Sequence, residues 1–121
     1  MPFVASHLGC AVKKAINPYA TFDMLLFKEG SHWGFAEYRR RKHNSNKFKT
    51  IMLSKHKFVV PYDMPAFFVV EWDDVVGIVQ LDMDWAKDAK LFERTTNKRE
   101  GDRAEDVVWI PVDWFTLLPR F

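Results

Sequence analysis

The sequence lacks several features that common protein classes require. Its single cysteine, Cys10, cannot form an internal disulfide and leaves no thiolate cluster for zinc. No apolar run approaches the roughly 18 residues that span a bilayer. A glycine-rich phosphate loop and a Gly-x-Ser-x-Gly elbow are both missing, so the sequence does not support a P-loop or an α/β-hydrolase function. These absences predict a soluble protein of a reducing compartment, most simply the cytoplasm, without a membrane partner.

The sequence does contain a large apolar fraction. Hydrophobic residues make up 48% of the 121 positions, including eleven Phe and five Trp. This composition argues against wholesale disorder and can build the core of a single domain over residues 1–121. Several tryptophans could stack on bases in an open site, although such residues more often fill a small core.

Charge is distributed unevenly along the chain. The net charge is only +2, yet residues 39–57 carry eight Lys or Arg and no acid, whereas residues 63–88 carry seven acids and one base. A basic block can attract phosphate backbones, although a solvated loop is its commoner meaning. The prediction is a nucleic-acid contact along this block. The side chains assigned to it are Arg40, Arg41, Lys42, Lys47, Lys49, Lys55 and His56.

Apolar patterns predict two β-hairpins. Residues 21–27 and 33–41 form the first candidate pair, joined by a glycine-containing turn. Residues 65–72 and 75–82 are β-branched and aromatic runs, which favour a second hairpin.

The remaining segments give weaker patterns. They predict a short helix within residues 1–15, a turn at Asn17-Pro18, a short helix over 50–60, a charged helix and loop over 84–106, a strand at 107–112 and a packed tail. The order of elements predicts a mixed α/β or α+β fold, with short helices flanking one central, mostly antiparallel or mixed sheet.

The first hairpin is expected to bring two carboxylates together. Side chains two positions apart on a strand share a face, so Glu37, Arg39 and Arg41 should point the same way. Strand pairing would bring Asp23 close to Glu37, and two carboxylates with waters and a phosphate suit Mg²⁺. A same-face ion pair on a wet sheet is the plainer alternative. The apolar surroundings of Glu37 favour the site, because a buried carboxylate needs a cationic partner or a metal.

The order of these motifs carries a family resemblance. Asp23, then Glu37-Tyr38-Arg39, the basic loop, MLSKHKF and PAFFVV together resemble the PD-(D/E)XK (restriction-endonuclease-like) nuclease superfamily, especially its small bacteriophage-encoded members. The resemblance covers about residues 17 to 118 and implies a small restriction-endonuclease-like core. It implies that Asp23 and Glu37 bind Mg²⁺, with Mn²⁺ as a substitute and the Tyr38 carbonyl as a third ligand.

The resemblance also identifies the catalytic cations. Arg39 stands where the family has a lysine, and arginine can contact phosphate but cannot serve as a base. Lys57, at the start of the next predicted helix, is predicted to replace that lysine from another element; the plainer alternative is that Lys55, His56 and Lys57 form an exposed helix face. The catalytic set is therefore Asp23, Glu37, Arg39 and Lys57.

Three functions remain open from the sequence. The first is a DNA-binding, nuclease-like phage protein whose Mg²⁺-dependent phosphodiester hydrolysis is weakened or lost through Arg39. The second is an inactive version of the fold that binds a host protein and inhibits or redirects it. The third is a DNA-binding accessory subunit without chemistry. Any of these could act as a monomer or a homodimer in the host cytoplasm.

Overall fold

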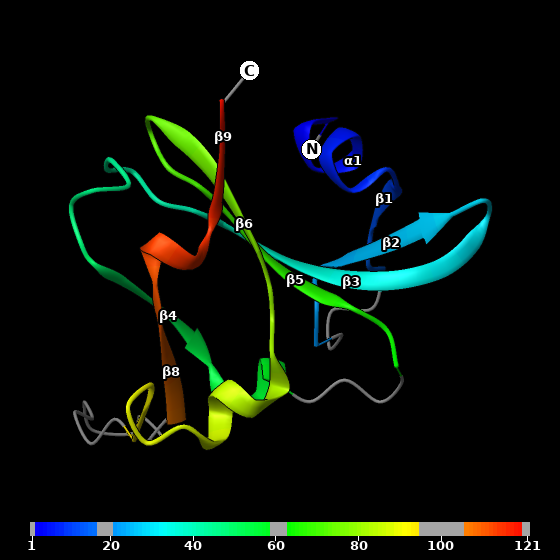
Figure 1. Ribbon diagram of the computed structural model, residues 1–121. Coiled ribbons are helices and arrows are strands. Elements are labelled where there is room, and N and C mark those ends of the chain that lie inside the picture. Colours follow the sequence, from blue (N-terminus) through cyan, green and yellow to red (C-terminus); the bar gives the residue numbers. More distant parts are fainter. Residues whose placement is uncertain (1, 17–20, 59–62, 95–105, 120–121) are drawn as a thin grey trace.

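The computed structural model describes residues 2–16, 21–58, 63–94 and 106–119. In these ranges nine strands dominate and the helices are short (Figure 1). Six strands form a mixed sheet in the order β1-β2-β3-β5-β6-β9, and three form a smaller sheet in the order β4-β8-β7. The predicted mixed α/β fold, consistent with a small restriction-endonuclease-like core, is confirmed. The helices are α1 Pro2–Leu8 and the 3₁₀ turns η1 Lys55–Phe58, η2 Met83–Lys87 and η3 Val112–Trp114; the strands are β1 Ala11–Lys14, β2 Met24–Lys28, β3 Ser31–Arg40, β4 Thr50–Ser54, β5 Ala66–Glu71, β6 Val75–Gln80, β7 Phe92–Arg94, β8 Asp106–Pro111 and β9 Thr116–Pro119.

The first predicted hairpin is confirmed. β2 and β3 pair antiparallel, and the pair Lys28–Ser31 closes a two-residue turn. Glu29 and Gly30 in that turn have φ values of 51° and 79°, the left-handed conformation that favours a tight hairpin connection. The register pairs Met24 with Ala36. Asp23, just before β2, is therefore placed near Glu37.

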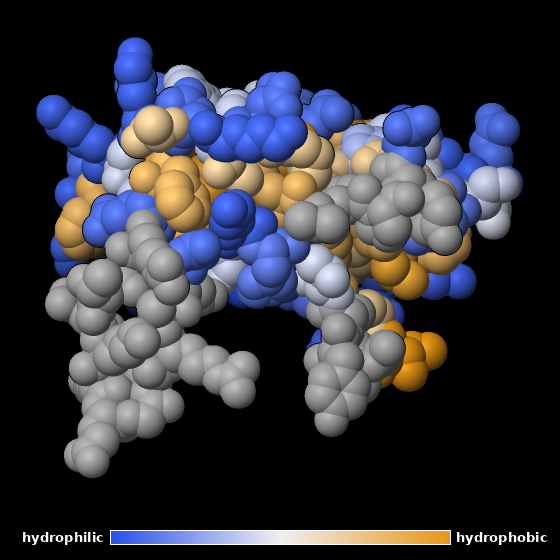
Figure 2. All heavy atoms as spheres, turned by 90° about the horizontal axis from the view of Figure 1, so that it is seen from below, coloured by the Kyte–Doolittle hydropathy of each residue, from blue (hydrophilic) through white to orange (hydrophobic). Residues whose placement is uncertain are grey.

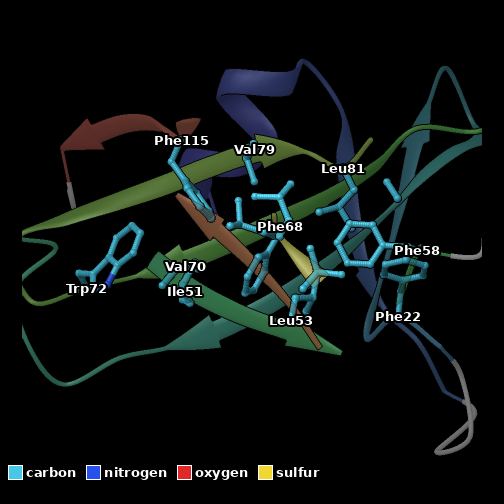
Figure 3. Packing of buried hydrophobic residues seen from close by; sticks show 14 residues of the cluster. Phe22, Ile51, Leu53, Phe58, Phe68, Val70, Trp72, Val79, Leu81 and Phe115 are labelled. Atoms are coloured by element: carbon cyan, nitrogen blue, oxygen red, sulfur yellow. The ribbon is translucent and has the colours of Figure 1, made fainter. Parts of the chain in front are cut away.

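β5 forms the centre of the mixed sheet and is buried on both faces. It pairs parallel with β3 and antiparallel with β6, which confirms the second predicted hairpin. Phe68 and Val70 face one hydrophobic cluster, while Phe67 and Val69 face another. The first cluster lies between the two sheets (Figure 3). Seen from below, hydrophobic atoms form a band bordered by hydrophilic atoms (Figure 2).

The predicted helix over residues 50–60 is wrong for residues 50–58, which the structure describes. Thr50–Ser54 is strand β4, which pairs antiparallel with β8, and only Lys55–Phe58 turns into a 3₁₀ helix. Ile51 and Leu53 are buried while Met52 between them is exposed, which is the alternation of a half-buried strand. The smaller sheet that contains β4 was not expected, because the prediction had only one sheet.

Other segments also differ from the predictions. The N-terminal helix ends at Leu8, since Gly9 adopts a φ of 62°, and residues 11–14 form edge strand β1 instead of continuing it. Within residues 84–106 the described parts form the end of η2, a turn, strand β7 and the first residue of β8, and the tail contributes β9 at the opposite edge. The predicted turn at Asn17-Pro18 and residues 95–105 of the predicted charged helix and loop lie outside the described residues.

Gly77 in β6 is required by close packing. A Cβ atom there would lie 2.5 Å from Trp72 Cζ3 and 3.0 Å from Phe115 Cδ2, and Trp72 is fully buried. Gly77→Ala is expected to lower the free energy of unfolding by about 1–3 kcal/mol, because the added methyl overpacks the core. Urea unfolding would measure this, with the exposed neighbour Gln80→Ala as the control. An unchanged midpoint for Gly77→Ala would contradict the packing argument.

Candidate active site

The two predicted carboxylates meet on the face of the mixed sheet that is turned toward the smaller sheet. Glu37 lies in the middle of β3 and is 1% exposed, whereas Asp23 is half-buried. The Asp23 N–H donates to Glu37 Oε1 at 3.4 Å, and the Tyr38 N–H donates to Asp23 Oδ1 at 3.2 Å. These reciprocal hydrogen bonds extend the strand register by one residue and fix the two side chains against each other.

Two cations converge on one oxygen of Glu37. Lys57 Nζ lies 3.2 Å from Glu37 Oε2, and Arg39 Nη2 lies 2.5 Å from the same atom. The Lys57 side chain is 11% exposed and the Arg39 side chain 40%. Lys57 also donates to the Thr21 carbonyl, and Arg39 Nη1 donates to the Tyr38 carbonyl at 3.0 Å. Lys57 is thus the more enclosed of the two.

The position of Lys57 depends on η1 and its buried anchor. Phe58 follows Lys57 and is 4% exposed, within the same cluster as Phe22. Lys57 Nζ lies 5.7 Å from the centre of the Phe22 ring. Because Phe22 directly precedes Asp23, the packing that buries these two phenylalanines also brings the ammonium to the carboxylate pair.

The ionised form of Asp23 is disfavoured in this arrangement. Burial raises the pKa of its carboxyl above the usual range, and the negative charge of Glu37 raises it further, while the Tyr38 N–H and Arg39 lower it. The effects that raise the pKa of Asp23 therefore outweigh those that lower it.

The residues fit a divalent cation in chemical terms. Two adjacent carboxylates supply hard oxygen ligands, and a cation between them would relieve the repulsion that raises the pKa of Asp23. Across the described part of the chain no group of three or more His, Cys, Asp or Glu gathers. Waters and a substrate phosphate would have to complete the coordination, as is usual for Mg²⁺.

Asp23→Asn is expected to raise the melting temperature at pH 7 in EDTA. A carboxyl with a raised pKa in the folded state binds protons more tightly there than in the unfolded chain. Its contribution to stability therefore falls as pH rises from the unfolded value of 3.8 through the folded pKa. Asparagine removes that loss and can still accept the Tyr38 hydrogen bond. Thermal unfolding from pH 4 to 8 would measure the effect, with exposed Asp113→Asn as the control. A lower melting temperature for Asp23→Asn at pH 7 would contradict it.

The predicted nucleic-acid residues divide between two faces. Arg40 points away from the carboxylate pair and binds Glu71 Oε2 at 3.2 Å and Asp73 Oδ1 at 2.5 Å. Arg41 returns to the face of Glu37, in keeping with strand alternation. The remaining members are exposed on the loop after β3 or on η1: Lys42, Lys47, Lys49, Lys55 and His56. Lys55 lies over the Phe92 ring at 4.8 Å.

One participant in the site was missed by sequence reasoning. The Thr21 carbonyl accepts a hydrogen bond from Lys57, and no pattern of side chains signals a backbone acceptor. His43 and Phe48, inside the basic block, were also given no role, although both line a separate cavity.

Comparison with known proteins identifies the family. The model of a family described as "Phage putative PDDEXK endonuclease" matches residues 2–118. The chain belongs to this family. Neither a curated protein nor a solved structure matches it. Family membership supports a phage nuclease-like protein, and PDDEXK nucleases generally use divalent metals. None of the described helices is long and apolar enough to cross a membrane.

Proposed function

We propose that this PDDEXK family member is a deoxyribonuclease that hydrolyses phosphodiester bonds with Mg²⁺, or Mn²⁺ in its place. The observation that carries the proposal is that Asp23 and the enclosed ammonium of Lys57 both contact Glu37. A structural ion pair would need a single cation opposite Glu37. Here two cations and a second carboxylate gather on it.

Asp23 and Glu37 would hold the metal through their carboxylate oxygens. When bound, a divalent cation polarises the scissile phosphoryl group and makes water more acidic. The Lys57 ammonium, fixed by Glu37 Oε2 and the Thr21 carbonyl, is available to hydrogen-bond the attacking water or the charge that develops on phosphate. Water attacks phosphorus, the bond to one deoxyribose oxygen breaks, and that oxygen takes up a proton.

Lys57 takes the role of the family lysine in this proposal. An ammonium is compact and can be placed against a reacting oxygen, whereas the guanidinium of Arg39 is planar and always charged. Arg39 is the more exposed of the two, which suits contact with an adjacent phosphate. Both groups therefore act, one at the reacting centre and one on the DNA backbone.

DNA would lie along the basic face that continues from the carboxylate pair. Arg41 shares the face of Glu37, and exposed Lys42, Lys47 and Lys49 follow in the loop. Lys55 and His56 border the site from η1. Phosphate contacts of this kind position a nucleic acid without reading its sequence. Residues 1–121 would act as one domain, as a monomer or homodimer, in the host cytoplasm.

The test is cleavage of supercoiled, linear, single-stranded and branched DNA with Mg²⁺, Mn²⁺ or EDTA. The expected result is nicking or cutting of at least one substrate with a metal and none with EDTA. Activity that persists in EDTA, or no cleavage of any substrate at any metal concentration, would contradict the proposal.

A second candidate function is that of a catalytically inactive protein that binds a host protein. The contacts of Arg39 favour it. Arg39 bonds both Glu37 Oε2 and the Tyr38 carbonyl, which are oxygens that a metal could otherwise use. On this alternative, added Mg²⁺ leaves the melting temperature unchanged and no substrate is cut, while an affinity column retains one host protein. Metal-dependent cleavage that is lost in the Glu37→Gln variant would exclude it.

A further inference from the structure

A cavity opens beyond the end of β3 and does not include the carboxylate pair. Its volume is about 340 Å³, within the range of sites that hold small molecules. The cavity lies between the loop after β3 and the smaller sheet. None of Asp23, Glu37, Arg39 and Lys57 lines it; the lining residues are Arg41, His43, Phe48, Thr50, Ile51, Met52, Trp72, Trp109 and Val112.

The walls of this cavity are rich in aromatic groups. Phe48 is 56% exposed, and the His43 ring meets it edge-on with centroids 5.2 Å apart. Trp109 is held by a hydrogen bond from Nε1 to Glu93 Oε2 at 2.9 Å, and buried Trp72 also lines the cavity. The cavity therefore presents flat, partly exposed rings to a ligand.

The loop that carries two of these rings is held in place from the mixed sheet. The Asp73 N–H donates to the His43 carbonyl at 3.0 Å. The Ser45 N–H and Oγ both donate to the Asp74 carboxylate at 2.8 Å. The wall formed by His43 and Phe48 is thus fixed before any ligand arrives, which lowers the entropy cost of binding.

The rim of the cavity is cationic. Arg41 lines it, and in the described part of the chain no acid forms an ion pair with Arg41. Lys47 Nζ lies 5.4 Å from the centre of the Phe48 ring, and Lys42 and Lys49 are exposed on the same loop. A ligand that matches both features is flat and apolar with an attached anion. A nucleobase on its phosphate backbone has this character.

The distance from the cavity to the carboxylate pair suits a nucleic acid strand. Glu37 and Arg41 lie on one face of an extended segment, four residues apart, which corresponds to about 13 Å. A DNA strand advances about 3.4 Å per nucleotide when stacked in a duplex, so only a few nucleotides separate the two points. One strand can therefore cross both.

We propose that this cavity binds an unpaired nucleobase a few nucleotides from the cleavage point, so that the substrate class is DNA with a single-stranded segment. This rests on the proposed nuclease function. Base pairing hides the ring faces of a duplex between stacked neighbours, and only an unpaired base can place a ring face against the aromatic side chains that line the cavity. Stacking on an aromatic ring tolerates any base, which predicts little sequence preference.

The test is DNA binding in EDTA at fixed salt. Fluorescence anisotropy would measure the affinity for matched single-stranded and duplex oligonucleotides. Phe48→Ala is expected to weaken single-strand binding about tenfold or more and to leave duplex binding within about twofold. Phe48→Tyr should keep the wild-type affinity for single-stranded DNA. Leu117→Ala is the control, because Leu117 is a comparably exposed hydrophobic residue at 48%, located on β9. An oligonucleotide of abasic residues should bind wild type and Phe48→Ala equally.

Two outcomes would overturn the proposal: unchanged single-strand affinity in Phe48→Ala, and equal losses for single strand and duplex. If Phe48→Ala keeps its DNA affinity but loses binding to a host protein, the cavity is a docking site for a protein side chain instead. Because binding is measured without metal, its result is independent of cleavage. The cleavage assay with Glu37→Gln tests the proposed active site, whereas the anisotropy measurement tests only the cavity.

Discussion

Glu37→Gln is expected to reduce metal-dependent DNA cleavage by at least about a hundredfold. The amide keeps the shape of the carboxylate but has no charge, so it is a poor ligand for a hard cation and a weak partner for Lys57. Glutamine suits this test better than alanine, because Glu37 is 1% exposed and truncation would leave a cavity. The measurement is the initial nicking rate with Mg²⁺ and with Mn²⁺.

The stability of this variant must be followed together with its activity. Lys57 would keep the Thr21 carbonyl but lose its charged partner, and we expect a loss of roughly 1–3 kcal/mol in unfolding free energy. Glu71→Gln is the matched control, since Glu71 also pairs with an arginine, Arg40, on the other face of the sheet. Full cleavage by Glu37→Gln, or an equal loss in Glu71→Gln, would remove Glu37 from the mechanism.

Lys57→Met is expected to lower the cleavage rate at saturating DNA by about 10²–10³-fold, the usual effect of removing one preorganised stabilising group. Arg39→Gln should lower it by about tenfold or less. Lys57 is 11% exposed and held by oxygens from two segments, whereas Arg39 is 40% exposed. Single-turnover rates, with DNA affinity measured separately, would distinguish a loss of chemistry from a loss of binding.

Two further variants test this assignment. Lys55→Met removes a neighbouring lysine of the same 3₁₀ turn and should weaken DNA binding without changing the rate at saturation. Arg39→Lys restores the family residue at its own position. If Lys57 already fills the role, Arg39→Lys should leave the rate nearly unchanged. A large rise would mean that Lys57 does not replace the missing group and that the natural protein is a weakened enzyme.

The correct structural predictions concern residues close together in the sequence, whereas the incorrect one depends on a contact between distant segments. Both hairpins were predicted because each is encoded by adjacent runs, and Glu29-Gly30 supplies the turn conformation locally. The helix over residues 50–60 was wrong because a short apolar run suits either a strand or a helix. Pairing of β4 with β8, far along the chain, makes it a strand.

The sequence by itself determined the family, the mixed fold and the nearness of Asp23 to Glu37, because strand alternation and a tight turn act over a few residues. Only the tertiary structure decided that Lys57 reaches Glu37 Oε2, that Arg40 binds Glu71 and Asp73 on the other face, and that Phe48 and Trp109 line the same cavity. Each of these depends on contacts between segments distant in the chain. Such contacts form only when the two sheets bury their shared core.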